Sequence, residues 1–296
     1  MAQTKLVWQS KFVLLVVLPF VGASVVLQAH WWAVQDAPVA IWTIGLSLIL
    51  ATVTLGMRTA TPGAAFAGAV ITSSLMFSTL IFPYKPWQTA LVPLLAVLLL
   101  SFAATRVGRA QKESLGIAER RGGRAASQVA ANLGIAALVS DELPQSWLIA
   151  TGWFSLPGLS PVSLFAVGLA ALAEAAADTV SSEVGQVFGG RPRMITTLRS
   201  VEPGTDGAIS VAGTAAGVLA AGVVALAGCL ALRGGPALLW VSWAGGVFGL
   251  FFDSLLGAVF EERGWLNNDA VNFLSTASAA GFALGLLAIL RLVNGG

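Results

Sequence analysis

Apolar runs of the length that crosses a bilayer recur from one end of this chain to the other, and they constrain its fold more than any other feature. An α-helix needs about 20 predominantly apolar residues to span the hydrocarbon core. With 56% hydrophobic and 10% charged residues, and a mean hydropathy of +0.83, the chain is far more apolar than a soluble domain. The sequence therefore predicts an all-α fold, a polytopic helical membrane protein with about nine transmembrane helices.

The predicted spans are the apolar runs at 12–29, 38–56, 63–82, 86–104, 127–140, 161–177, 208–231, 236–259 and 270–292. The first run is too long for the apolar region of a signal peptide, so we expect it to remain as a span. Residues 146–158 contain three aromatic side chains and predict an interfacial or re-entrant segment, with a full crossing as the alternative.

Positive charge predicts the orientation. The basic loop at 105–126 holds five arginines and one lysine against two glutamates, so the positive-inside rule places it in the cytoplasm. Nine spans would place the loops at 178–207 and 261–269 on the same side. We expect a multi-pass protein, in the inner or plasma membrane if bacterial, with a cytoplasmic active site. Its N-terminal four-helix region is 1–104, and its catalytic membrane domain is 105–296.

Cysteine and histidine are almost absent, which excludes several chemistries. Cys229 is the only cysteine and lies in an apolar run, so the chain has no disulfide framework and no thiolate zinc site. His30 is the only histidine, and beside two tryptophans it is expected at the membrane interface. Any proton transfer therefore has to use a carboxylate.

The segment 178–207 concentrates acids, hydroxyls, arginines and glycines in an otherwise apolar chain. Glu174 and Asp178 are four residues apart, so on a helix they share a face and repel each other unless a cation or a proton offsets the charge. Glu183 points elsewhere if the helix continues. The residues that would then join the Asp178 face are Ser181, Ser182 and Gly185. A capped helix end with solvated acids is the alternative.

The second half of this segment has the composition of a phosphate cradle, with hydroxyls, a forked cation and flexible backbone. These residues are Thr196, Thr197, Arg199, Gly204, Thr205 and Gly207. No Walker A element or Rossmann fingerprint accompanies them. A nucleotide bound here would be held by a different binding motif.

A second polar cluster lies at 253–272. Asp253 is embedded in an apolar run, where an unpaired charge costs on the order of 2.5–3.5 kcal/mol, so it needs a partner. Three residues at the start of the last span offer the hard oxygen ligands that magnesium accepts. They are Asn268, Asp269 and Asn272. The alternative is a helix cap at the asparagines and an interhelical hydrogen bond at Asp253.

A third cluster opens the fifth predicted span. Arg124, Gln128 and Asn132 step by four, so one helical face carries a cation and two amides into the membrane. With Arg120 and Arg121 they could form a wall that faces phosphates. A positive-inside anchor with amide bonds between helices is the alternative.

These motifs together resemble a known family. Four motifs are similar to those of the integral-membrane family that contains the plant phytyl-phosphate kinases and animal transmembrane protein 19. They are the run from Ala177 to Gly185, the Pro-Gly-Thr-Asp-Gly run that ends at Gly207, Asp253-Ser-Leu-Leu-Gly and Asn268-Asp-Ala-Val-Asn. The resemblance covers Arg106 to the C-terminus. A more distant likeness links Asp178, Ser182 and Gly185 to dolichol kinases and CDP-diacylglycerol synthases, although no lysine precedes Thr197 here.

The resemblance implies a nucleotide-dependent kinase that converts a prenyl, phytyl-like monophosphate to the diphosphate, with CTP as the expected donor and Mg²⁺ as cofactor. The catalytic residues would be Asp178, Asp253 and Glu183. The metal ligands would come from Asp178, Asp253, Asn268, Asp269 and Asn272. The nucleotide would contact Ser181, Ser182, Gly185, Thr196, Thr197, Arg199, Gly204, Thr205 and Gly207. The acceptor phosphate would contact Arg120, Arg121, Arg124, Gln128 and Asn132.

Three alternatives stay open: a CTP-dependent lipid-phosphate cytidylyltransferase, an isoprenoid alcohol kinase, and a non-enzymatic ion or lipid transporter. The formal charge of +2 lies mostly in loops beside spans. This distribution favours membrane lipids over nucleic acid as partners. The expected partners are therefore a prenyl-phosphate lipid, a nucleotide and membrane lipids.

Overall fold

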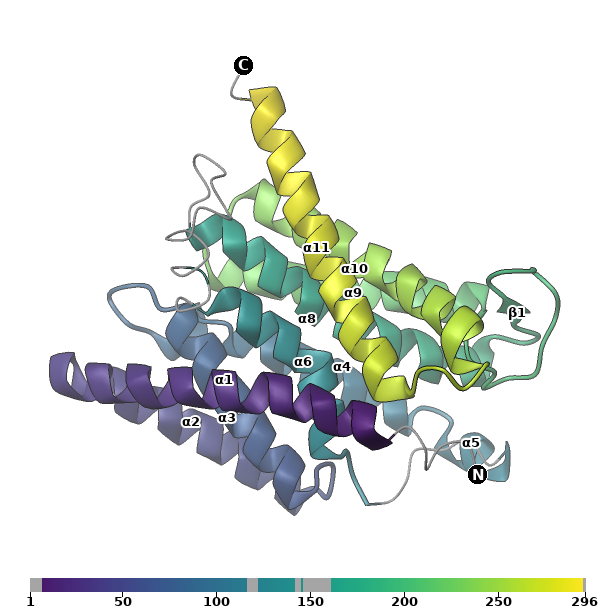
Figure 1. Ribbon diagram of the computed structural model, residues 1–296, viewed down its shortest axis with the longest axis horizontal. Helices are drawn as coiled ribbons and strands as arrows, with labels where there is room; N and C mark the ends of the chain where they lie inside the picture. The colour runs from purple at the N-terminus through teal and green to yellow at the C-terminus, as the bar shows by residue number, and fades with distance from the viewer. Residues whose placement is uncertain (1–6, 116–121, 142–144, 146–160, 295–296) are drawn as a thin grey trace.

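The computed structural model describes residues 7–115, 122–141, 145 and 161–294, and it is an all-α bundle with one two-stranded hairpin (Figure 1). The apolar helices are α1 (Val7–Gln35), α2 (Ala37–Gly56), α3 (Pro62–Ser78), α4 (Leu91–Arg106), α6 (Ala126–Ser140), α8 (Pro161–Phe188), α9 (Val211–Ala231), α10 (Pro236–Leu256) and α11 (Asn268–Asn294). The short elements are η2 (Pro86–Gln88), α5 (Arg109–Leu115), β1 (Arg193–Met194), β2 (Ala208–Ile209) and η3 (Gly257–Glu261).

Each predicted span coincides with an apolar helix, and the all-α class is confirmed. Within the described residues, six helices are long and apolar enough to cross a membrane: α1, α2, α8, α9, α10 and α11. The other three, α3, α4 and α6, have 17, 16 and 15 residues. Nine crossings therefore stay a prediction, as does the orientation that depends on them. The predicted interfacial segment at 146–158 lies outside the described residues.

The sixth predicted span ends too early at residue 177. Helix α8 continues through Phe188, so more than a third of the predicted 178–207 loop is helical. No proline interrupts this run, and Gly185 lets the extra turns pack closely against Gly213 of α9. The acids and serines of the motif consequently lie on a helix.

Helix α8 is the centre of the bundle. It packs against α4, α6, α9, α10 and α11. Of the residues in its most apolar 18-residue stretch, 72% are buried. The corresponding share is only 22% for α1 and α2, which form an outer layer on one side of the bundle (Figure 1). Exposed Phe12, Phe20 and Trp42 cover this outer layer, as expected for a surface that faces lipid.

Small residues allow the helices around α8 to approach closely. A Cβ atom added to Gly217 of α9 would lie 2.8 Å from the backbone oxygen of Ala177. One added to Gly246 of α10 would lie 3.1 Å from the backbone nitrogen of Glu174. In membranes, such small-residue contacts provide the van der Waals packing that holds helices together.

The first helix is tied to the last connection. The Gln9 side chain donates to the carbonyl of Trp265 at 2.9 Å and accepts from the Asn267 backbone N–H at 2.8 Å. Asn267 in turn caps α11 by accepting from the Ala270 N–H. The start of α11 is therefore fixed by a residue of α1.

Replacing Gly217 by alanine should separate α8 and α9, because the new methyl group meets backbone. Overpacking of this kind costs about 1–3 kcal/mol, which a thermal melt of the purified protein in detergent would detect as a lower Tm. Gly281→Ala is the matched control, because a Cβ at Gly281 meets nothing within 4 Å. Equal melting temperatures for the two variants would contradict this account of the packing.

Candidate active site

A polar cavity of about 320 Å³ lies where α6, α8, α10 and α11 meet the 203–210 segment. The hairpin explains this arrangement. Strand β1 pairs antiparallel with β2, with Met194 opposite Ala208, and Ser210 after β2 lies against Gly185 and Gly189 at the end of α8. The cavity thus brings together residues from four helices and one loop.

Carboxylates from two helices dominate the cavity. Asp178 of α8 and Asp253 of α10 both line it. Ser182 donates to Asp178 at 3.4 Å, and Ser275 of α11 lies beside Asp253. Among the described residues, the Asp253 Oδ2 atom is buried with no hydrogen-bond partner. A buried acceptor in this state is costly unless a ligand or solvent satisfies it.

Glu174 lies one helical turn deeper and was not among the catalytic, binding or metal residues predicted from the sequence. Its side chain is 1% exposed, it interacts with Asp178, and its Oε1 atom has no hydrogen-bond partner within the described part of the chain. Gly249 of α10 leaves the space that the Glu174 side chain occupies. The i, i+4 spacing of Glu174 and Asp178 was the sequence signal for this residue.

The opposite wall comes from α6. Arg124, Gln128 and Asn132 all line the cavity, and Arg124 interacts electrostatically with Asp178. Gln128 also caps α6, because its Oε1 accepts from the Ala125 N–H at 2.8 Å. Asn272 of α11 donates to Asn132 Oδ1 at 3.4 Å, while its own Oδ1 has no partner in the described structure. Arg124, Gln128 and Asn132, predicted for phosphate, thus share one cavity with Asn272, predicted for metal.

Glycines bring the loop onto α10. Gly207 has φ +77°, and its α-carbon packs against the backbone of Ala258 in η3, a turn of π-helix. A side chain at this position would clash and would also be strained. Gly204, with φ +87°, and Thr205 line the cavity beside it.

Two acids that line the same rim, Asp206 and Glu261, were not assigned from the sequence. Desolvation and the neighbouring Glu262 carboxylate raise the pKa of Asp206. Asp206 lies inside the Pro-Gly-Thr-Asp-Gly run, which was the signal that could have found it.

Several predicted site residues lie away from the cavity. Thr196, Thr197 and Arg199 are exposed in the turn that follows β1, and they do not line it. Asp269 is buried but is also absent from the lining, whereas its neighbours Asn268 and Asn272 are present. Arg120 and Arg121 lie outside the described residues. The remaining predicted residues converge on the cavity.

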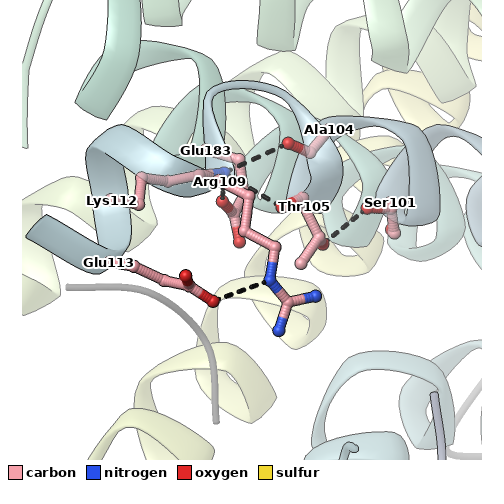
Figure 2. A network of polar contacts seen from close by, with 7 residues as sticks. All are labelled: Ser101, Ala104, Thr105, Arg109, Lys112, Glu113 and Glu183. Atoms are coloured by element: carbon pink, nitrogen blue, oxygen red, sulfur yellow. Dashed lines mark hydrogen bonds and ion pairs between the residues drawn. The ribbon is translucent and has the colours of Figure 1, made fainter. Parts of the chain in front are cut away.

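Glu183 lines the edge of the cavity but is engaged by a cation from another helix (Figure 2). It forms an ion pair with Lys112 of α5, whose side chain is 2% exposed. The Lys112 ammonium also donates to the carbonyls of Ala104 and Thr105, at 3.3 and 3.2 Å. Lys112 therefore caps α4 and joins it to α8. A general acid or base role for Glu183 does not fit this pairing.

No group of three or more His, Cys, Asp or Glu side chains in the described ranges is arranged to hold a metal ion unaided. Asp178 and Asp253, with the Asn272 amide oxygen, nevertheless offer the oxygen ligands that Mg²⁺ prefers. Magnesium commonly keeps several waters and binds through one or two carboxylates together with substrate phosphates. The cavity therefore suits an ion that arrives with a phosphate ligand.

A second, apolar cavity of about 400 Å³ adjoins the polar one. Its walls come mainly from α2, α3 and α4. Arg124 and Asn132 line both cavities, so these two residues mark the boundary between them.

Comparison with known proteins identifies the family. The profile of the integral membrane protein family DUF92 matches residues 45–280, which is most of the chain. The chain belongs to the DUF92 family. The DUF92 match begins within α2, so the family likeness extends further toward the N-terminus than the motifs from Arg106 onward predicted. The predicted resemblance to a family of integral membrane proteins with plant members is confirmed.

Three DUF92 relatives come from different lineages. The chain is 47% identical over 108 residues to an uncharacterized membrane protein of Methanocaldococcus jannaschii. The aligned region covers 36% of this chain and 45% of that protein. It is 32% identical over 219 residues to one of Synechocystis, covering 70% and 77%. It is 32% identical over 184 residues to the chloroplastic protein VTE6 of Arabidopsis thaliana, covering 61% and 53%. The matches thus span about half the length of the archaeal and plant relatives. No solved structure matches the chain.

Replacing Lys112 by methionine should destabilise the protein strongly. Removing one partner of a buried ion pair costs on the order of 3–5 kcal/mol, because the other charge stays buried and unpaired. Glu113→Gln is the control on the same helix. It removes a surface ion pair in which the Glu113 and Arg109 side chains are 39% and 45% exposed (Figure 2). Exposed pairs contribute less than about 1 kcal/mol. Thermal melts of both variants test this difference, and similar losses would contradict it.

Proposed function

We propose that this DUF92 protein is a kinase that transfers the γ-phosphoryl group of a nucleoside triphosphate, with CTP as the expected donor, to a prenyl monophosphate. The observation that carries the proposal is the junction of the two cavities. A polar cavity lined by the carboxylates of Asp178 and Asp253 and by side-chain amides adjoins an apolar cavity at Arg124 and Asn132. A lipid phosphate has the same division into an apolar tail and a charged head.

The reaction suits the side chains that are available. An oxygen of the prenyl monophosphate forms a bond to the γ-phosphorus, the bond from that phosphorus to the β–γ bridging oxygen breaks, and the nucleoside diphosphate leaves. Phosphoryl transfer depends on positioning and charge stabilisation more than on a strong base. The acceptor phosphate is already ionised, so a cavity lined without histidine among the described residues can support the reaction.

The chain's residues divide between donor and acceptor. Arg124 holds the acceptor phosphate at the boundary of the cavities, where Asn132 can donate to it. Ser182, Gly204 and Thr205 contact the donor phosphates on the loop side. Asp178 and Asp253 are the carboxylates suited to hold Mg²⁺, which supplies positive charge to the phosphate oxygens when bound. The partnerless Oδ atoms of Asp253 and Asn272 support this fit.

The comparisons are consistent with a prenyl acceptor. The motifs resemble those of the family that contains plant phytyl-phosphate kinases, and the relative from Arabidopsis is a chloroplastic protein. The proposed cytoplasmic location of the site rests on the positive charge of the 105–126 loop.

Replacing Asp178 or Asp253 by asparagine should lower the rate of transfer by roughly 100-fold or more, because each change removes an anionic oxygen ligand that would hold Mg²⁺ at the phosphates. Purified protein, Mg²⁺, farnesyl monophosphate and CTP labelled at the γ-phosphate provide the assay. Asp36→Asn is the control, since Asp36 precedes α2 and its side chain makes no capping hydrogen bond. Full activity of the Asp178 and Asp253 variants would contradict the assignment of the site.

Labelling the α-phosphate of CTP distinguishes the kinase from a cytidylyltransferase. A kinase leaves this label in free CDP, whereas a cytidylyltransferase moves it to the lipid and releases pyrophosphate. Transfer to farnesol but not to its monophosphate would instead identify an alcohol kinase, and no transfer to any lipid would favour a transporter.

Chelation by EDTA should abolish the transfer, and Mg²⁺ should restore it, because two carboxylates and the donor phosphates would repel each other without a cation. The fold should survive chelation, since its described helices are held by packing around α8. An unchanged Tm with lost activity is therefore expected, and full activity in EDTA would contradict a magnesium-dependent site.

A further inference from the structure

The apolar cavity is open toward the lipid side of the bundle. Lining residues of α2 and α4 include exposed side chains, whereas Ala64 and Thr72 of α3 are buried, so α2 and α4 flank the opening and α3 forms the floor. Val53 of α2, Met57 directly after α2 and Leu99 of α4 line it and are 48%, 45% and 66% exposed. Because exposed residues of both helices line the cavity, it is accessible from the surface of the bundle, which would let a hydrocarbon chain enter from the bilayer between α2 and α4.

Positive charge gathers at one end of this cavity. Arg58 follows α2, Arg106 ends α4, Arg109 begins α5, and Arg124 precedes α6, and all four line the cavity. No aspartate or glutamate belongs to the described lining. The cavity therefore suits an amphiphile with an apolar tail and an anionic head, with its head directed toward the polar cavity through Arg124.

The floor of the cavity is made of small side chains. Ala64, Gly68 and Thr72 of α3 follow one another at four-residue spacing and all line it. A Cβ atom added to Gly68 would meet nothing within 4 Å, so a larger side chain there would project into open space. Gly68 is therefore the position at which side-chain size controls how much tail the cavity can hold.

We propose that this cavity holds the hydrocarbon tail of the acceptor, that the tail enters sideways between α2 and α4, and that Gly68 sets the tail length that the protein accepts. The inference rests on the proposed function in taking a prenyl monophosphate as the occupant. It adds the location of the tail, its route from the membrane and the residue that limits it.

The test compares Gly68→Phe with Gly45→Phe in the full chain. Gly45 of α2 is also half-buried with open space around its Cβ, but it does not line the cavity. Geranyl, farnesyl and geranylgeranyl monophosphate are the probes, with binding of labelled lipid and transfer from CTP measured separately. Gly68→Phe should weaken binding of the longest tail by about ten-fold or more, while the shortest tail binds as in the wild type. Gly45→Phe should leave the whole series unchanged.

A second measurement uses the unaltered protein, so the test does not depend on the folding of a variant. A farnesyl monophosphate with a photoreactive group on its tail should label residues of α2, α3 or α4, as located by mass spectrometry of the peptides. Labelling elsewhere, or a tail-length profile that Gly68→Phe does not change, would overturn the inference. Displacement of the label by ordinary phospholipid at equal concentration would also overturn it, because the cavity would then be a general lipid site.

The two proposals fail differently. If the wild type binds the monophosphates with a tail-length profile that Gly68→Phe shifts, but transfers no phosphate, the kinase proposal is wrong and the tail site stands. If it transfers phosphate with the same profile in both glycine variants, the kinase proposal stands and the tail site is wrong.

Discussion

Close packing around α8 is the constraint on which the rest of the structure depends. A helix with carboxylates at Glu174 and Asp178 would be expelled from a lipid-facing position, because unpaired charges in hydrocarbon are costly. Here alanines of α8 lie against glycines of α9 and α10, and the backbones come close enough for van der Waals contact to hold them. The outer helices α1 and α2 face the lipid in its place. The acids are consequently enclosed by protein, where they can serve a site.

Enclosure also explains why a polar and an apolar cavity can lie next to each other. Helix α6 separates them, with Asn132 in contact with Asn272 on the polar side and with Arg124 at the end that both cavities share. The Lys112 ion pair fixes the end of α4, a wall of the apolar cavity, to α8, a wall of the polar one. Each cavity is therefore shaped by the same rigid elements.

The sequence predicted most of the helices and part of the site. Apolar runs located every described membrane helix, and the spacing of Asp178, Ser181, Ser182 and Gly185 predicted that they would share a face if α8 continued. Polar residues in the turn after β1 were assigned to the site because hydroxyl and guanidinium groups bind phosphate. In the structure this turn leaves Thr197 and Arg199 exposed and away from the cavity. Lys112 could not have been found, since in sequence it is one of six cations in a basic loop. The local sequence pattern predicts helices and which residues share a helical face. An ion pair such as that between Lys112 and Glu183 depends on how distant helices pack in the folded protein.

The link between Gln9 and Asn267 has a consequence for how the protein is made. During synthesis α1 emerges well before α11, and the hydrogen bonds that join Gln9 to residues 265 and 267 close only when the start of α11 has been inserted. Until then α8 lacks α11, and its acids lie beside helices that do not yet enclose them fully. The polar cavity therefore forms late in assembly. In a chain truncated before α11, the acids of α8 would be only partly enclosed by protein within the bilayer.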